Sequence, residues 1–413
     1  MNKYSVALTA LFVAAGTLPH ALAAEADNPP SVVSTVNGEL KIQQLASLEF
    51  PWGMALMPDG GLLITENPGR LRIFKDGKLS APIDNVPAVS YRDSKSEQGG
   101  LLDVALDPDF AQNKHIYLSY TEDAEKQPES LADTGDVRFG EYLDHTDNRL
   151  RGGVVARATL DGNRLSDIET IWRQTPKTVG RGHFGHRLIF RDDGTLFITS
   201  GERGRFEPAQ SDTSNLGKVM RINKDGSIPK DNPFAEKKDA QGGIWSTGHR
   251  NIISAAMHPD TKQLWAWEMG PLGGDELNIV ERGKNYGWPA VSNGANYDNS
   301  TIPPHSARSE FEAPVRTWTP VLSPSGAMFY QGSLLPWRGD AIVGGLSSKS
   351  LIRLSFDGRT VKNEERIDMQ RRIRDVTEAP DGSLYVITDD KKGELLRLTP
   401  AASQSQTANK KAS

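Results

Sequence analysis

The chain has 413 residues, enough to bury a large core, and carries 48 Lys and Arg against 53 Asp and Glu, a formal net charge of −5. This mild charge offers no basic face for nucleic acid, and the absence of cysteine excludes both a disulfide framework and a cysteine-ligated metal site. The 39 Gly and 25 Pro suit many short strands joined by tight turns better than a helical bundle.

The first 23 residues have the pattern of a secretory signal peptide. Lys3 supplies a positive charge, an apolar run from Val6 to Ala15 follows, and Ala21-Leu22-Ala23 offers the small residues of a cleavage site. The alternative is an uncleaved N-terminal anchor, but the apolar run is short for a membrane span. No other stretch is long and apolar enough to span a membrane. We therefore expect a periplasmic or secreted protein with no membrane span after cleavage.

A short pattern then recurs along the chain. A turn rich in Asp, Pro and Gly precedes a β-prone run in six copies, which begin at Pro58, Asp107, Asp192, His258, Pro336 and Pro380. A second β-prone run follows each copy, at 71–74, 154–157, 219–222, 277–280, 351–354 and 395–398. Four of these runs lead to Asp-Gly pairs typical of hairpin turns, at 76–77, 161–162, 225–226 and 357–358.

Six such units without a long amphipathic helix predict an all-β fold, a six-bladed β-propeller of four-stranded antiparallel blades over residues 24–400. Closing the blades into a ring protects the sheet edges. The units are unevenly spaced, which indicates long loops at 121–149, 203–216 and 284–320, where a functional site would be built. The polar tail 401–413 is predicted to be disordered.

Two segments contain residues suited to proton transfer and to anion stabilisation. His183 lies among glycines at 182 and 185, where a light backbone would let its imidazole reach a pocket floor and accept a proton. Taken alone, such a histidine is more often structural. Arg250 and Asn251 offer a charged fork and a neutral donor that suit an oxyanion or a quinone carbonyl. A solvated turn is the competing interpretation of these two residues.

Two further segments suit a cation and an anion. Residues 270–276, followed by 285–289, combine loop carbonyls with carboxylates, the hard oxygen ligands that calcium prefers. A salt-bridge cluster explains this pattern equally well. Arg372 and Arg374 stand two apart in a β-prone run, so they would share a face and form a site for a polycarboxylate. The competing interpretation is a solvated strand face paired with Glu364 or Glu365.

The order and spacing of these segments resemble the glucose/sorbosone dehydrogenase family, specifically its soluble aldose sugar dehydrogenases that depend on pyrroloquinoline quinone (PQQ). The matching blocks run from about Phe50 to about Leu398 and are 97–102 with 107–110, the His183 segment, 217–233, 248–251, 270–276 with 285–289, and 372–376. The resemblance implies a six-bladed propeller, in agreement with the repeats, with PQQ on top of the ring and calcium beside it.

The resemblance also implies roles for single residues. His183 falls on the family's catalytic base, Glu202 on the acidic residue that orients the base, and Arg250 on a contact to cofactor and transition state. The implied cofactor contacts are Gln98, Arg250, Asn251, Asp275, Arg372 and Arg374. The implied calcium ligands are the carbonyls of Gly270 and Pro271 beside the cofactor, and Glu276 with the carbonyl of Tyr286 at a second, structural ion.

Two positions depart from the family pattern. Gly182 stands where the glucose dehydrogenase branch has an acidic residue just before the base. Ser347 aligns with a lysine that contacts the quinone in that branch, and Lys349, two residues later, is the nearest candidate to replace it. The cofactor contact at this position is therefore in question.

The implied activity is oxidation of the anomeric hydroxyl of an aldose to a lactone, by hydride transfer to PQQ and onward transfer to an unidentified electron acceptor. Two alternatives stand beside it. One is a calcium-dependent propeller lactonase or hydrolase, in which His183 activates water. The other is a non-catalytic propeller that binds a carbohydrate or a protein. The loops 121–149 and 290–316, which would select the sugar, match the family least.

Overall fold

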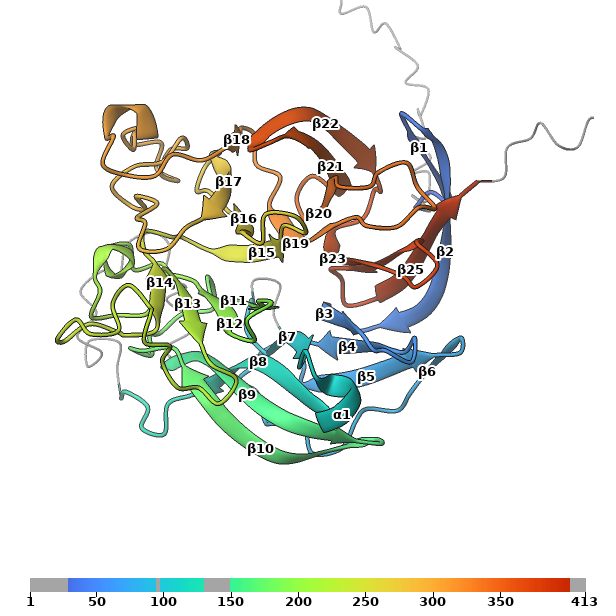
Figure 1. Cartoon of the computed structure of the whole chain (residues 1–413), viewed down its shortest axis with the longest axis horizontal. Helices are drawn as coiled ribbons and strands as arrows, with labels where there is room; N and C mark the ends of the chain where they lie inside the picture. Colours follow the sequence, from blue (N-terminus) through green and yellow to red (C-terminus); the bar gives the residue numbers. More distant parts are fainter. Residues whose placement is uncertain (1–28, 94–96, 130–148, 402–413) are drawn as a thin grey trace, which may run out of the picture.

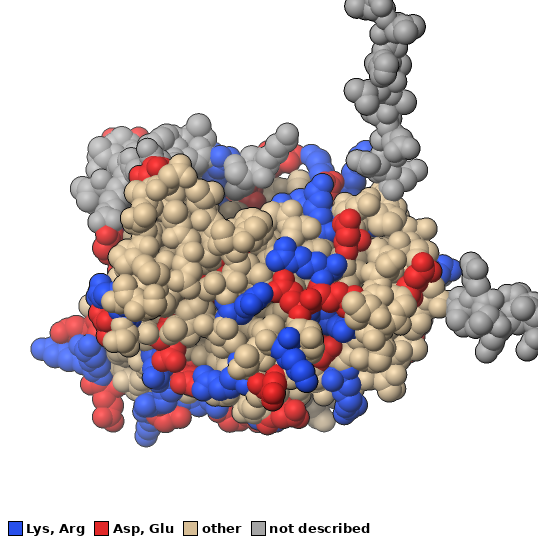
Figure 2. All heavy atoms as spheres, turned by 90° about the horizontal axis from the view of Figure 1, so that it is seen from above, with Lys and Arg blue, Asp and Glu red and all other residues tan. Residues whose placement is uncertain are grey.

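The protein is a six-bladed β-propeller, as the repeats predict (Figure 1). The computed structural model describes residues 29–93, 97–129 and 149–401. The predicted signal peptide, residues 402–413 of the predicted tail and most of the 121–149 loop lie outside the described residues. Within the described part of the chain, no helix is long and apolar enough to cross a membrane. Figure 2 shows acidic and basic side chains interspersed on the face it presents, in keeping with the small net charge.

Each blade is an antiparallel sheet whose first strand lies nearest the ring axis, where it contacts the first strands of the neighbouring blades. Blades 1 to 3 consist of β3 (Pro51–Leu56), β4 (Leu62–Glu66), β5 (Arg70–Lys75) and β6 (Lys78–Leu79); β7 (Leu101–Leu106), β8 (His115–Asp123), β9 (Arg151–Asp161) and β10 (Arg164–Arg173); and β11 (Gly185–Phe190), β12 (Leu196–Ser200), β13 (Lys218–Ile222) and β14 (Ile244–Ser246). Blades 4 and 5 consist of β15 (Ile252–Met257), β16 (Leu264–Glu268), β17 (Asp275–Val280) and β18 (Arg316–Trp318); and β19 (Pro324–Phe329), β20 (Ala341–Gly345), β21 (Ser350–Asp357) and β22 (Thr360–Asp368). The described helices are single turns, α1 (Phe110–Asn113), η2 (Glu207–Gln210) and η3 (His305–Ala307).

Blade 6 combines the two ends of the chain. Its inner strands β23 (Ile373–Glu378), β24 (Leu384–Thr388) and β25 (Gly393–Pro400) come from the C-terminal end, and β2 (Gly38–Leu48) from the N-terminal end pairs with β25. The hairpin partner of β2 is β1 (Val32–Thr35), which extends this sheet to five strands. The pairing of β2 with β25 closes the ring.

The recurring sequence pattern locates the second and third strands of every blade, because each β-prone run at 71–74 and its five counterparts becomes a third strand. Three of the four Asp-Gly pairs form the expected hairpins, at 76–77, 161–162 and 357–358. The fourth pair lies in a turn with a left-handed glycine, as expected, but that turn does not form a tight hairpin. Asp225-Gly226 makes a turn, with Gly226 at φ 85°, but the chain then runs through 227–243, past Pro229 and Pro233, before β14 begins.

The core lies between the blades. Six buried apolar clusters each join side chains from two neighbouring blades, one cluster for every interface around the ring. Leu63 of blade 1 and Val104 of blade 2 share one cluster, and Trp265 of blade 4 packs edge-on against Phe329 of blade 5 in another. Each large apolar side chain that is fully buried in this way stabilises the folded state by ~1.5–3 kcal/mol.

Hydroxyl groups add a repeated polar link between blades. In blades 1, 2 and 3 a hydroxyl on the second strand donates to a backbone carbonyl on the first strand of the next blade. The donors and acceptors are Thr65 and Leu102, Ser119 and His186 (2.8 Å), and Thr199 and Ile252 (2.8 Å). These short β-branched or small residues therefore fix the register of adjacent blades as well as fill space.

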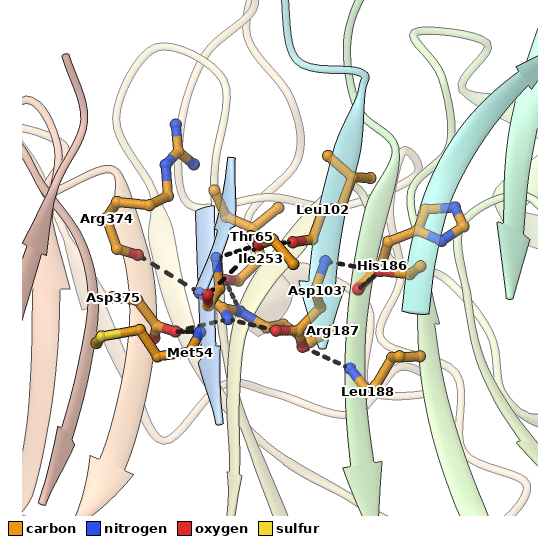
Figure 3. A network of polar contacts seen from close by, with 12 residues as sticks. Met54, Thr65, Leu102, Asp103, His186, Arg187, Leu188, Ile253, Arg374 and Asp375 are labelled. Atoms are coloured by element: carbon orange, nitrogen blue, oxygen red, sulfur yellow. Dashed lines mark hydrogen bonds and ion pairs between the residues drawn. The ribbon is translucent and has the colours of Figure 1, made fainter. Parts of the chain in front are cut away.

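A single arginine, Arg187 of β11, joins the blades at the ring axis (Figure 3). Its guanidinium donates to the carboxylates of Asp103 (3.1 Å) and Asp375 (3.2 Å) and to the carbonyls of Ile253 (2.9 Å) and Arg374 (3.4 Å), and it lies 4.4 Å from the ring centroid of Trp52. These partners belong to blades 2, 6, 4, 6 and 1, so one buried cation from blade 3 contacts four other blades.

The remaining blade reaches this network through a glycine. Gly326 of β19 packs so closely against Asp375 that a Cβ would lie 1.6 Å from the carboxylate. The network thus sets one cation against two buried carboxylates. Burial raises the pKa of Asp103 to about 6 and also raises the pKa of Asp375.

We predict that Asp103 makes stability depend on pH. Its folded pKa of about 6 exceeds its ordinary value of 3.8, so the folded protein binds the extra proton between these values and gains stability as pH falls through about 6. As the pH is lowered from about 6 to about 4, the free energy of unfolding of the wild type, measured with urea, should rise relative to that of Asp103→Asn by up to ~1.4 kcal/mol per pH unit. A difference between the two proteins that stays constant with pH would show that Asp103 is ionised in the folded state.

Candidate active site

The predicted site residues gather at one end of the ring. First and second strands are antiparallel neighbours, so the start of one and the end of the other meet at the same edge of a blade. In blade 3 these ends carry His183 and Glu202, in blade 4 Arg250 and Met269, and in blade 6 Arg372 and Asp389. Residues far apart in sequence therefore lie side by side.

The first of two cavities at this end has a volume of ≈ 240 Å³. The polar side chains Gln98, His183 and Arg250 line it, and so do the aromatic side chains Phe206, Trp288 and Tyr297. The rings of Phe206 and Trp288 lie 5.5 Å apart. Such a combination of aromatic walls with a few convergent polar groups is typical of a small-molecule site.

The second cavity, of ≈ 270 Å³, shares Gln98 with the first. Its floor is apolar, because Trp52, Phe184, Ile253 and Leu346 form a buried cluster against which Met269 packs. Its rim is charged and carries Arg372, Arg374 and Asp389. A planar ligand with an aromatic face and anionic edges fits such a cavity.

His183 and Glu202 form a close pair behind the first cavity. Nδ1 of His183 lies 2.5 Å from Oε1 of Glu202, and the other carboxylate oxygen accepts from the backbone N–H of Phe206 (2.9 Å). The His183 side chain is 21% exposed and that of Glu202 is 0% exposed. Because Nδ1–H donates to the carboxylate, a neutral His183 keeps Nε2 as an acceptor.

The local backbone holds this pair in place. His183 has a left-handed φ of 54°, and its N–H donates to Oε1 of Gln98 (2.9 Å). The chain before Glu202 passes so close that a Cβ on Gly201 would lie 2.0 Å from the carbonyl oxygen of His183. Only glycine permits this approach, so the sequence at 201–202 brings the carboxylate to the imidazole.

Burial and the positive charge of Arg250 lower the pKa of His183, and Glu202 opposes them only in part. Burial also disfavours ionisation of Glu202, but its interaction with His183, which donates a hydrogen bond to it, and the positive charge of Arg250 outweigh burial and lower the pKa of this carboxyl. The pair is therefore a neutral imidazole held by an ionised carboxylate, which is the arrangement of a general base.

Arg250 is fixed from both its backbone and its side chain. Its guanidinium donates to the carbonyls of Met269 (3.1 Å) and Gly270 (2.9 Å) and to the hydroxyl of Tyr297 (3.2 Å). Its backbone N–H donates to Glu268, whose carboxylate also contacts His249 (3.0 Å). A permanent positive charge is thus aimed into the first cavity.

Two predicted cofactor contacts line neither cavity. Asn251 is buried, and its Oδ1 accepts from the N–H of Gly185 (3.1 Å). The carboxylate of Asp275 accepts from the backbone N–H groups of Gly270 (2.8 Å), Leu322 (2.7 Å) and Ser323 (2.7 Å), and burial raises its pKa. Both side chains hold loops that border the cavities.

The loop that contains Gly270 and Pro271 is tightly folded. A Cβ on Gly270 would lie 2.3 Å from the carbonyl oxygen of Gly273 and 2.4 Å from that of Gly274. Pro271 lines the first cavity, and the Gly270 carbonyl accepts from Arg250. Carbonyl oxygens crowd this loop, and such oxygens are ligands that calcium accepts.

Glu276 is buried beside a small cavity of ≈ 10 Å³, which Glu268 and Tyr286 also line. The carbonyl of Tyr286 accepts from Nε2 of His305 (3.2 Å), and Nδ1 of His305 lies 3.7 Å from Oε1 of Glu276. Burial, and then the neighbouring charge of Glu268, raise the pKa of Glu276 well above its ordinary value. Among the described residues, Glu276 has no basic partner at hydrogen-bond distance, and it accepts from the side-chain amide of Asn278 (3.2 Å).

The arginine pair shares a face, as predicted, but its partner is neither Glu364 nor Glu365. Both guanidiniums bind the carboxylate of Asp389, at 2.6–3.1 Å. Arg374 is 12% exposed and Arg372 is 46% exposed. Burial disfavours ionisation of Asp389, yet the charges of Arg374 and Arg372 outweigh it and lower the pKa of Asp389.

Neither candidate for the questioned lysine contact lines a cavity. Ser347 is exposed, and its hydroxyl lies 2.7 Å from that of Ser323, which lines the second cavity. Lys349 is exposed and has a left-handed φ of 50°. The described structure therefore gives Lys349 no place among the residues around the second cavity.

Sequence reasoning missed Asp389, Glu268 and the apolar floor. The positions of the two acids, Asp389 and Glu268, along their blades could have pointed to them. Each lies at or just after the end of a second strand, as Glu202 does, and each accepts hydrogen bonds from residues that precede or begin the first strand of its own blade. Glu66 of blade 1 repeats the arrangement with the N–H of Glu49 (2.6 Å).

Comparison with known proteins places this geometry in context. A family model described as glucose/sorbosone dehydrogenase matches residues 48–397. The aldose sugar dehydrogenase YliI of Escherichia coli is 40% identical over 376 residues, which cover 89% of this chain and 94% of that protein.

Two solved structures share the fold over nearly their whole length. The apo-form of the soluble aldose sugar dehydrogenase from Escherichia coli has a TM-score of 0.78 at 38% identity and covers 88% of this chain and 100% of its own. The PQQ-bound form of aldose sugar dehydrogenase from Streptomyces coelicolor has a TM-score of 0.66 at 26% identity, and the match covers 90% of this chain and 99% of its own.

The charges around His183 predict opposite changes in its pKa for two variants. Arg250→Met removes a positive charge and should raise the pKa of His183, whereas Glu202→Gln removes a negative charge and should lower it further. Titration of the imidazole Cε1 resonances by NMR measures both. The resonance of His258, at the other end of blade 4, should titrate alike in all three proteins. Shifts of the same sign in both variants would contradict the assigned pairing.

Proposed function

The chain belongs to the glucose/sorbosone dehydrogenase family, and on this premise we propose that it oxidises the anomeric hydroxyl of aldose sugars to lactones with PQQ as the hydride acceptor. The observation that carries the proposal is the pair of adjoining cavities. One is faced by the His183–Glu202 pair, and the other has an arginine pair over an apolar floor.

The second cavity fits PQQ, a planar aromatic quinone with three carboxylates. Trp52 and Phe184 offer the flat apolar surface, and Arg372 and Arg374 offer guanidinium forks that match carboxylates. Gln98, on the wall shared with the first cavity, and Arg250 would hold the quinone end. When bound, PQQ supplies the acceptor for the hydride of the sugar. Asn251 and Asp275 would act through the loops that they hold.

His183 would serve as the base. His183 lines the first cavity, and its Nε2, which is left as an acceptor, would take the proton from the anomeric hydroxyl. Glu202 would fix the imidazole through Nδ1 and stabilise the positive charge that forms on it, much as a carboxylate supports histidine in hydrolytic triads. The lowered pKa of His183 keeps the imidazole neutral at neutral pH.

Arg250 and the aromatic wall would complete the site. The guanidinium of Arg250 is held by two carbonyls and a phenol, so it can stabilise negative charge that develops across the cavity without reorganising. Phe206 and Trp288 would pack against the apolar face of a sugar ring and exclude water. An electron acceptor, which the chain does not identify, completes the turnover.

Two calcium ions complete the proposal. The carbonyls of Gly270 and Pro271 would hold one beside the cofactor, where a hard cation polarises an oxygen. Glu276 and the carbonyl of Tyr286 would hold the other. The buried Oδ1 of Asn278 has no hydrogen-bond partner among the described residues, and Nδ2 of the same amide donates to Glu276 (3.2 Å), so this amide would be the nearest source of a further oxygen ligand.

The ends of the chain are also part of the proposal. We infer that residues 1–23 are removed as a signal peptide, that the mature protein is periplasmic or secreted, and that the tail 401–413 remains disordered. The mildly acidic mature chain then offers no general attraction to a polyanionic cofactor, so the local charge of the arginine pair matters.

The activity is tested by reconstitution. Apo-protein mixed with PQQ and calcium should reduce a redox dye when an aldose is added. His183→Ala should lose ~10²–10⁴-fold in turnover and keep its affinity for PQQ, since a positioned base contributes that much. The wild-type rate should fall in acid as His183 protonates.

Two results would overturn this assignment. Turnover of a lactone without any quinone would favour the hydrolase, and tight sugar binding with no dye reduction would favour a binding propeller. A His183→Ala variant within a few-fold of wild type would remove this residue from catalysis. A panel of sugars in the same assay identifies the preferred aldose.

The structural calcium site has its own test. Calcium added to chelated apo-protein should raise the melting temperature, because a ligand at a hundredfold excess over its Kd stabilises by ~2.7 kcal/mol. Glu276→Gln should lose most of this gain. Glu310→Gln, which changes an exposed glutamate in the connection between β17 and β18, should keep it. An equal calcium response in all three proteins would refute Glu276 as a ligand.

A further inference from the structure

The carboxylate of Asp389 is divided between two arginines in a specific way. Oδ2 accepts from Nε (2.9 Å) and Nη2 (2.6 Å) of Arg372, and Oδ1 accepts from Nε (3.1 Å) and Nη2 (2.6 Å) of Arg374. Each oxygen therefore engages the side edge of one guanidinium. The carboxylate is 14% exposed at the rim of the second cavity.

This arrangement leaves the other edge of each guanidinium for a ligand. A guanidinium carries five N–H donors, and the Nε–Nη2 edge uses only part of them. Among the described residues, neither Nη1 has a hydrogen-bond partner. Two end-on forks thus remain at the rim of a cavity whose floor is apolar.

We propose that Asp389 is a positioning residue, which holds Arg372 and Arg374 as a preset clamp for two carboxylates of one planar ligand. The inference rests on the proposed function, in which that ligand is PQQ. Asp389 would not compete with the ligand, since it occupies the edges that the ligand does not need.

Two physical effects of Asp389 have opposite signs, which makes the proposal testable. Its negative charge reduces the local charge of the pair from +2 to +1 and so weakens attraction to a polyanion. Its four hydrogen bonds, however, hold two like charges together and restrict two long side chains before the ligand arrives. We assign the larger effect to positioning, because an ordered fork gains two hydrogen bonds per carboxylate without a further loss of side-chain freedom.

Asp389→Asn tests the balance. The amide keeps one acceptor oxygen but turns an N–H₂ group toward the other arginine, which then loses its place. Titration of PQQ into apo-protein, followed by tryptophan fluorescence, should show binding about tenfold weaker than wild type, equivalent to ~1.4 kcal/mol. The affinity should become more salt-dependent, because the pair now carries its full charge.

Two controls separate positioning from damage to the cavity. Phenanthrenequinone, a planar quinone without carboxylates, should bind wild type and Asp389→Asn alike. Asp381→Asn makes the same chemical change in blade 6, where Asp381 binds Arg397 outside the cavity, and should leave PQQ affinity unchanged.

The outcomes are distinct. Equal or tighter PQQ binding by Asp389→Asn would overturn the clamp, and so would an equal loss of affinity for phenanthrenequinone, which would indicate a damaged floor. A wild type that does not bind PQQ would overturn both the clamp and the proposed function. Binding of PQQ as expected, without oxidation of any aldose, would refute the proposed function and leave the clamp standing.

Discussion

The buried guanidinium of Arg187 is the interaction on which the ring depends. A propeller has no continuous hydrogen-bonded sheet from blade to blade, so its inner strands need another connection near the axis. Arg187 provides it with two carboxylates and two carbonyls (Figure 3) and with the indole of Trp52, which together come from four other blades. A buried charge with this many partners is stable only when all of them are in place, so the network specifies a single arrangement of the blades.

The candidate site shares residues with this network. Trp52 stacks on Arg187 and also forms part of the cavity floor, and Ile253 accepts from Arg187 while its side chain belongs to the same floor. Arg374 gives its backbone carbonyl to the network and its side chain to Asp389. The backbone of Arg374 is therefore held near the ring axis by the same guanidinium that contacts the cavity floor.

Much of the fold could be predicted because its signals are local. A turn followed by a β-prone run is contained within about ten residues, and six copies indicate six blades. The pairing of β2 with β25 carries no such signal, since its strands lie at opposite ends of the chain. The candidate site also contains residues that the local sequence predicts and residues that it does not. His183 and the arginine pair stand in recognisable segments, whereas the roles of Asp389 and Glu268 depend on partners 15 to 18 residues earlier, across a hairpin. Asp275 shows the reverse case: a carboxylate in a ligand-like segment is taken up by three backbone N–H groups.

The closure of blade 6 has a consequence for how the chain folds. Five blades consist of strands that follow one another, so each can form as soon as it has been synthesised. β2 is made among the first and must wait for β25, which is made among the last, and until then it keeps an open edge. The pairing that closes the ring is thus a long-range one, and in a growing chain stopped short of Gly393 the strand β2 has only β1 as its partner, however many complete blades the chain already contains.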